Sequence, residues 1–308
     1  MRRLDNGFLA TLTGGLPVLT TGLSIGPDGV VRLTGARLAS PLLNLTGGGM
    51  RRADGQLMLT GRGAHRVYGP VEFELDGNIA RPRITVRLAN PLPSAGLRDV
   101  TLRLLPMAAG FDYQASGGSM LGPFAADGQI VLAAGQSAVI DVQRLNVGGT
   151  VARGRLAVVR GGLAGQMLVN GGGLDGSIIL SAPGGVQRIV AAMQARDARF
   201  SGPPPISVAR GQLNATILLD PRGTDIDATF EATGLRRGTL SIARVAGNAH
   251  WVDGVGAVRA SMAGARGRDF SFQTAVDVAR DGFRVRGQGM LARQPIRLTR
   301  PAIVQRDG

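Results

Sequence analysis

The chain has 308 residues, 44% of them apolar, which excludes wholesale disorder and allows one large domain or two ordinary ones. Its formal net charge of +14 comes from 35 basic and 21 acidic side chains, and because lysine is absent every basic residue is arginine. Cysteine is absent as well, which excludes disulfide frameworks, thiolate metal sites and cysteine nucleophiles.

Glycine and arginine dominate the rest of the composition. The chain contains 48 glycines, which keep no period of three, so a collagen-like helix is excluded and recurrent turns or bends are expected. Beyond pairs such as Arg51-Arg52, the arginines alternate with apolar residues along the chain. This spacing favours a solvated outer sheet face over the clustered patch that binds nucleic acid, and we expect no nucleic-acid partner.

The first residues do not read as a targeting segment. Arg2 and Arg3 are followed by Asp5, Asn6 and Pro17, which interrupt the apolar run of a signal peptide, and no stretch reaches the length of a membrane-spanning helix. We expect that an exported parent protein carries its leader or anchor outside this chain.

One catalytic motif occurs by letter. Residues 22–26 match the Gly-x-Ser-x-Gly nucleophile elbow around Ser24, but Asp28-Gly29 places a hairpin turn where the required helix should begin. His65 and His250 are the only histidines; neither has an acidic neighbour at metal-ligand spacing, and we expect each to be exposed or to lie on a strand face. We therefore predict no catalytic residue, no metal site, no cofactor and no enzyme activity.

A loose repeat recurs along the chain, in which Asp or Arg precedes Gly and apolar residues follow at two-residue intervals. Asp-Gly accepts the positive φ of tight hairpin turns, so each copy predicts a turn that leads into a strand. The copies are Asp28-Gly29, Asp54-Gly55, Asp127-Gly128, Arg153-Gly154, Asp175-Gly176, Arg210-Gly211 and Arg237-Gly238. Their irregular intervals favour a meander of antiparallel strands over a β-helix with one fixed coil length.

The clearest strands are expected within residues 71–104. Apolar and polar residues alternate over residues 71–76, 83–88 and 99–104, which is the pattern of half-buried strands. A less regular copy covers residues 225–231, where Asp225 and Asp227 would share a solvated face.

Two segments in the second half are ambiguous. Gly171, Gly173 and Gly176 match a dinucleotide-binding fingerprint, but residues 177–180 continue as a strand where a helix is required. Residues 187–199 fit helix and strand about equally, and we favour strand because no good N-cap precedes them.

Domain boundaries are weakly marked. Prolines cluster near residues 90–95 and 202–206, yet composition changes across neither. We predict one continuous architecture over residues 1–308, with possible breaks at these two places.

An apolar sheet face must be covered, and the sequence offers no amphipathic helices for this purpose. Either the sheet folds on itself as a sandwich, or it curls into a trough whose apolar lining stays available to ligands. The predicted lining residues are Val71, Phe73, Leu75, Ile84, Val86, Leu88, Val100, Leu102, Leu104, Leu156, Val158, Ile217, Leu219 and Phe230.

The style of residues 71–88, in which strand, Gly turn, Arg-Pro and strand follow one another, resembles the repeated units of the TamB/AsmA family of bridge-like lipid transfer proteins. Residues 121–132 and 258–264 resemble them too, and the likeness extends over nearly all of the chain. The resemblance implies an all-β fold: a long curved antiparallel meander forming an open, taco-like β-groove.

The resemblance also implies a function. Phospholipid acyl chains would slide along the groove between inner and outer membranes in the periplasm, and an outer-membrane barrel protein of the TamA type would be a partner in assembly and secretion. Family members carry an inner-membrane helix and a C-terminal partner-binding region, neither of which is recognised here, so we expect an internal or truncated segment. A structural or adhesive surface β-solenoid, indicated by the Gly-rich repeats, is the alternative.

Overall fold

The computed structural model describes residues 13–78, 80–91, 96–119, 121–132, 136–201, 205–220, 223–253, 255–279 and 282–305. Strands make up nearly all of these residues, with a short 3-10 turn at Pro183–Gly185. The chain divides into two compact units, Met1–Ala133 and Ala134–Gly308. The breaks expected near residues 90–95 and 202–206 fall within these units, and residues 92–95 and 202–204 lie outside the described residues.

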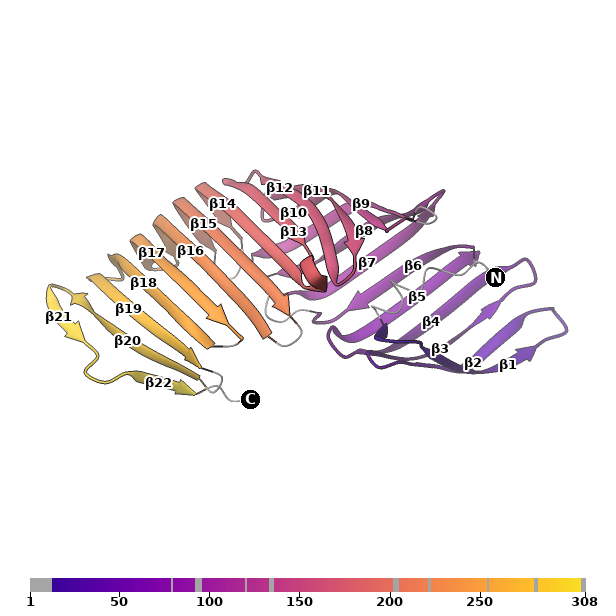
Figure 1. Ribbon diagram of the computed structural model, residues 1–308. Coiled ribbons are helices and arrows are strands. Elements are labelled where there is room, and N and C mark those ends of the chain that lie inside the picture. Colours follow the sequence, from indigo (N-terminus) through magenta and orange to yellow (C-terminus); the bar gives the residue numbers. More distant parts are fainter. Residues whose placement is uncertain are drawn as a thin grey trace. The chain divides into compact units, whose positions relative to one another are not determined.

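The first unit is a meander of nine strands, each antiparallel to the next (Figure 1). Their bounds are β1 Val18–Ile25, β2 Val31–Ala39, β3 Leu43–Arg51, β4 Gln56–His65, β5 Gly69–Asn78, β6 Arg81–Leu88, β7 Arg98–Met107, β8 Gly110–Ser119 and β9 Gly122–Val131.

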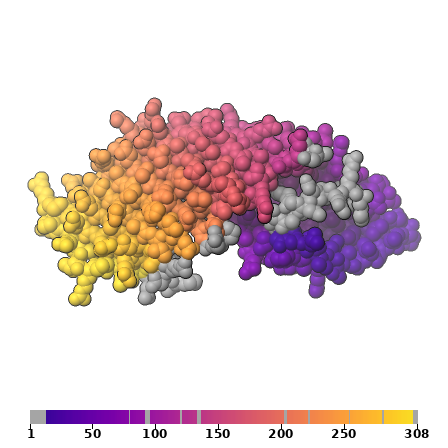
Figure 2. Space-filling model, viewed as in Figure 1, coloured from indigo at the N-terminus to yellow at the C-terminus, as the bar shows by residue number. Residues whose placement is uncertain are grey.

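The second unit continues in the same manner, and the short strands β21 and β22 both pair with β20. The bounds are β10 Val139–Val147, β11 Thr150–Val159, β12 Gly162–Asn170, β13 Leu174–Ser181, β14 Gln187–Phe200, β15 Ile206–Asp220, β16 Gly223–Arg237, β17 Leu240–Val252, β18 Val255–Ala265, β19 Asp269–Ala279, β20 Gly282–Leu291, β21 Gln294–Arg297 and β22 Ala302–Gln305. In the space-filling view, the side chains of neighbouring strands form a continuous surface over this unit (Figure 2).

The expected all-β fold with an open antiparallel meander is confirmed. The strands belong to one 22-stranded sheet, and because none of the described strand pairs joins the first and last strands of a unit, the meander stays open. Because consecutive strands are antiparallel throughout the described pairs, the parallel β-helix form of a solenoid does not apply.

Alternation of side chains gives each sheet two faces, which we call the apolar face and the polar face. In β5, for example, Val71, Phe73 and Leu75 are half-buried, whereas Glu72 and Glu74 on the other face are exposed. The alternating strands predicted over residues 71–76, 83–88, 99–104 and 225–231 are confirmed as parts of β5, β6, β7 and β16.

The turn prediction is right for three of the seven glycine repeats. Asp28-Gly29, Asp54-Gly55 and Arg237-Gly238 lie at hairpin connections, and all three glycines have positive φ. The prediction is wrong for Asp127-Gly128, Arg153-Gly154, Asp175-Gly176 and Arg210-Gly211, which lie inside β9, β11, β13 and β15. Gly128 lies opposite Tyr113 and Gly154 opposite Met167, and a Cβ added at Gly154 would collide with the Gln166 carbonyl oxygen on the neighbouring strand.

The segment that fitted helix and strand equally is strand β14, as favoured from the sequence. It belongs to four long strands, β14–β17, that share one irregularity. At the same level of each strand, successive apolar-face residues are three positions apart instead of two: Ala195 and Ala198, Val208 and Gly211, Ala232 and Leu235, Ile242 and Val245. Asp197 (φ 51°) and Gly234 (φ 63°) take up the extra residue in β14 and β16, as in β-bulges.

Candidate functional site

In the first unit, β5, β6 and β7 bring nine of the predicted lining residues together on the apolar face. They form three cross-strand rows of three: Val71, Leu88 and Val100; Phe73, Val86 and Leu102; Leu75, Ile84 and Leu104. Residues directly opposite each other in an antiparallel pair have their Cβ atoms about 5 Å apart, so each row is a set of touching side chains. The rows continue into β4 through Leu59 and into β8 through Ala115 and Tyr113.

The remaining predicted residues lie on the apolar face of the second unit. Leu156 on β11 and Ile217 on β15 belong to one row, which runs through Gly165, Leu180 and Ile189. Val158 lies two residues after Leu156 on β11, and Leu219 lies two residues after Ile217 on β15. Phe230 lies nearer the middle of β16. The structure therefore groups the predicted set into one patch per unit.

Sequence reasoning missed the continuation of this second patch. The row of Ile217 passes to Ile226, Trp251, Gly256, Val278 and Phe283 on the following strands. The alternation of β18, β19 and β20 is visible in the sequence, for example in Phe270 and Phe272 between polar residues, and it could have identified them.

Side chains on the apolar face contact their neighbours within the sheet, but no second layer covers them in the described residues. Only eight apolar residues in the described part of the chain are buried, and none of the larger side chains is fully buried. Val142, Leu156, Val169 and Val278 are among the eight, whereas Phe73, Val86 and Phe230 remain half-buried. The facing layer of a sandwich would cover such side chains, so their remaining exposure is that of an accessible wall.

Glycines inside the strands make room for aromatic rings on this wall. Gly61 lies opposite Phe73, and a Cβ added at Gly61 would collide with the ring. A ring atom of the opposite residue is likewise among the nearest atoms for Gly117 with Phe124, Gly247 with Phe230, Gly264 with Phe270 and Gly289 with Phe272, whereas a Cβ at Gly256, opposite Trp251, would meet backbone atoms of β17. A ring that lies over a cross-strand glycine fills the space left by the missing side chain, so the apolar face has no gap there.

The polar face carries the charges of the strands. Arg87 and Glu74 form an exposed ion pair of 3.4 Å between β5 and β6. In the second unit, Asp227 Oδ1 lies 2.6 Å from His250 Nδ1, with both side chains largely exposed. The sequence could not show this contact, because the two residues are 23 positions apart. In the described residues, no group of three or more acidic, histidine or cysteine side chains is arranged to hold a metal ion.

Both histidines lie on strands, within the expectation, but they differ in burial. His250 is exposed on β17, whereas His65 is 6% exposed at the end of β4. Its ring stacks on Tyr68 with 4.6 Å between centroids, and its Nδ1 accepts hydrogen bonds from the backbone N–H groups of Val67 and Tyr68. His65 therefore fixes the β4–β5 turn.

The letter matches to catalytic and nucleotide-binding motifs adopt strand structure. Ser24 lies inside β1, which leads into the Asp28-Gly29 turn, and residues 177–180 lie inside β13. No helix of the described residues is long and apolar enough to cross a membrane.

Comparison of the chain with protein-family models, with curated proteins and with solved structures finds no match in any of the three.

Proposed function

We propose that the chain is a non-enzymatic segment of a cell-envelope protein and that its apolar faces carry phospholipid acyl chains between the inner and outer membranes. The observation that carries this proposal is the continuous, half-exposed apolar wall in each unit. Exposed apolar surface is costly in water, and its persistence over many adjacent strands is typical of a binding surface.

The chemistry of the wall fits an acyl chain. The rows around Phe73, Val86 and Leu102 contain no charged side chain, whereas the charges lie on the opposite face of the same strands. A chain of methylene groups needs contact area and no directional partner, so a wall of side chains without hydrogen-bonding groups can hold it in successive positions.

The resemblance to the TamB/AsmA family supports the periplasm as the compartment. In this proposal the segment provides part of the lipid path, and the contact with an outer-membrane barrel protein, with any assistance to assembly and secretion, belongs to other parts of the parent protein.

The test compares the two faces of one strand. A photocrosslinking side chain placed at Phe73 or Val86 should capture phospholipid during expression in a Gram-negative host, and mass spectrometry should detect lipid with the purified chain. The matched control is the same side chain at Glu74, on the polar face of β5, where we expect no lipid adduct. Equal capture at Glu74 and Phe73, or no lipid at any position, contradicts the proposal.

A further inference from the structure

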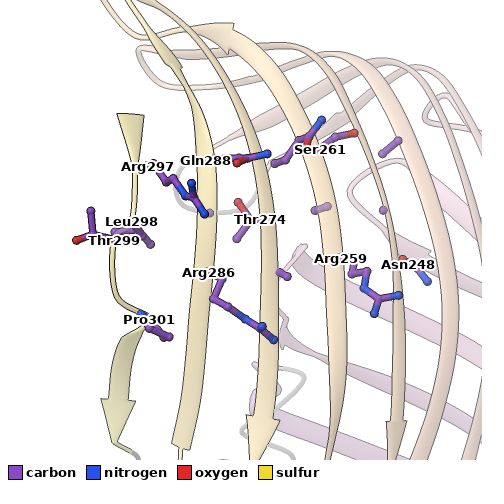
Figure 3. Close-up of a pocket in the computed structure, with 16 residues that line it drawn as sticks. Asn248, Arg259, Ser261, Thr274, Arg286, Gln288, Arg297, Leu298, Thr299 and Pro301 are labelled. Carbon is purple, nitrogen blue, oxygen red and sulfur yellow. The ribbon is translucent and has the colours of Figure 1, made fainter. Parts of the chain in front are cut away.

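A pocket of about 750 Å³ lies in the second unit at the C-terminal end of the sheet, where β17–β20 meet the segment after β21. Its charged lining residues are Arg259 on β18, Arg286 on β20 and Arg297 on β21. Figure 3 shows Arg297 beside Gln288 at one end, Arg286 near the middle and Arg259 beside Asn248 at the other end. No carboxylate lines the pocket.

The strand register explains why these arginines share one face of the sheet. Arg259 lies opposite Ala275, and Ala275 lies opposite Arg286, so the two arginines flank a small residue on the polar face. Adjacent strands are about 4.8 Å apart, which separates the two backbones by about 10 Å, a gap that two arginine side chains can close from either side. In the next row Gln273 lies opposite Gln288, and Gln288 lies opposite Arg297, which adds amide donors and a third guanidinium.

The charges of the pocket are only partly neutralised. Arg286 is paired with the Asp277 carboxylate, which lies outside the lining. Within the described part of the chain, Arg259 and Arg297 have no carboxylate partner. Two free guanidinium groups and several amide donors in one hollow make an anion-binding arrangement, and guanidinium forks match the oxygens of phosphate in a bidentate manner.

We propose that this pocket binds the phosphate group of a larger molecule through its three arginines, with Arg286 near the middle, restrained by Asp277, and with Arg259 and Arg297 on either side of it. The volume exceeds that of a phosphate ion, so the pocket also has room for the substituent that carries it. The site lies on the polar face, opposite the apolar wall, and it does not depend on the proposed lipid path.

The primary test is calorimetric titration of the full chain with inorganic phosphate at low salt. Replacing Arg259→Gln or Arg297→Gln should weaken binding about tenfold or more per arginine, since each removes charge-assisted hydrogen bonds. The matched controls are the single variants Arg188→Gln and Arg199→Gln, at two exposed arginines of β14 outside the pocket, each of which changes the net charge as much as one test variant does. Equal loss in test and control variants, or no phosphate binding by the unaltered chain, overturns the proposal.

A second test uses a variant that should strengthen phosphate binding, because a gain of affinity cannot result from misfolding. Asp277→Asn should release Arg286 and strengthen phosphate binding several-fold, whereas Asp175→Asn, an exposed carboxylate of β13, should not. An unchanged affinity in Asp277→Asn contradicts the role given to Arg286.

Flotation with vesicles distinguishes the two sources of phosphate. Capture by phosphatidylglycerol vesicles that is lost in the Arg259→Gln/Arg297→Gln chain supports a lipid headgroup as the ligand. Binding of inorganic phosphate without capture supports a soluble phosphate compound. Lipid crosslinking at Phe73 should be the same in all these variants, which separates a failure of this site from a failure of the lipid path.

Discussion

Phe230 on β16 lies directly opposite Gly247 on β17, and a Cβ added to Gly247 would come within 2.7 Å of Phe230 Cζ and 2.5 Å of the Arg259 carbonyl oxygen. The ring occupies the space that a side chain on β17 would need. Shape therefore determines this pair: the glycine is required by its neighbour and not by a turn.

We expect Gly247→Ala to destabilise the chain by about 1–3 kcal/mol, because the backbone carbonyl cannot move aside as a flexible side chain could. Gly211→Ala on β15 is the matched control, since an added Cβ there meets its nearest atoms at 3.4 Å, an ordinary contact. Urea unfolding monitored by circular dichroism gives both values. Equal stability of the two variants would show that the sheet yields at Gly247.

A charge on the apolar wall should affect both stability and lipid binding. Val86→Asp places a carboxylate between Phe73 and Leu102, and we expect a loss of about 1–3 kcal/mol together with reduced lipid co-purification. Thr85→Asp, on the polar face of the same strand, should retain the lipid. Lipid mass spectrometry on both purified chains decides, and full lipid retention by a folded Val86→Asp chain would contradict the assignment of the wall.

The β1–β2 turn contains an exposed carboxylate that titrates abnormally. Arg32 Nη2 donates a hydrogen bond to Asp28 Oδ2 at 2.8 Å, and this bond, followed by the Val30 N–H, holds the pKa of Asp28 below its usual value. A lowered pKa in the folded state means that the stabilisation is present above the ordinary pKa and is lost as pH falls through the folded one. We expect Arg32→Gln to raise the pKa of Asp28 toward its usual value in an NMR titration. High salt should also raise the pKa of Asp28 toward its usual value, because both groups are exposed and salt screens their attraction. An unchanged pKa in Arg32→Gln would rule out the ion pair as the main cause.

The extra residue of β14 is held in a conformation that few side chains accept. Asp197 has φ 51°, where aspartate is tolerated but a β-branched residue is strongly disfavoured. Asp197→Val should cost about 1–2 kcal/mol in thermal or urea unfolding. Arg199→Val, two residues further along the same strand, should change stability by less than about 0.5 kcal/mol. Similar losses in the two variants would contradict the strain at Asp197.

The strands that the sequence predicted best are those with charges on one face. Residues 71–76 alternate Val, Phe and Leu with Glu and Asp, and only a strand places these apolar and charged side chains on opposite faces. The same alternation in the next two strands predicts the nine lining residues of β5, β6 and β7. The apposition of β5 and β6 was within reach because the short connection between Asn78 and Arg81 fixes their register, whereas the longer connection between Leu88 and Arg98 leaves the register of β6 and β7 open.

The errors come from residues whose role depends on a neighbour in space. Gly128 and Gly154 follow Asp and Arg as turn glycines do, but they pair with Tyr113 and Met167 inside the sheet, which no local pattern reveals. Residues 187–199 carry apolar and alanine side chains on both faces, and their strand form is secured by pairing with β13 and β15. The burial of His65 could not be predicted for the same reason, since the turn that it fixes lies beyond its own strand.

The displaced alternation in β14–β17 links the lengths of four strands. Deleting the extra residue from β15 alone would turn Ile206 and Val208 toward the polar face while Phe200 and Leu235 beside them stayed where they are. Homologues of this protein can therefore gain or lose the extra residue in one of these strands only if the adjacent strands change in the same way. An alignment of homologues should show the extra residues of β14, β15, β16 and β17 present together or absent together.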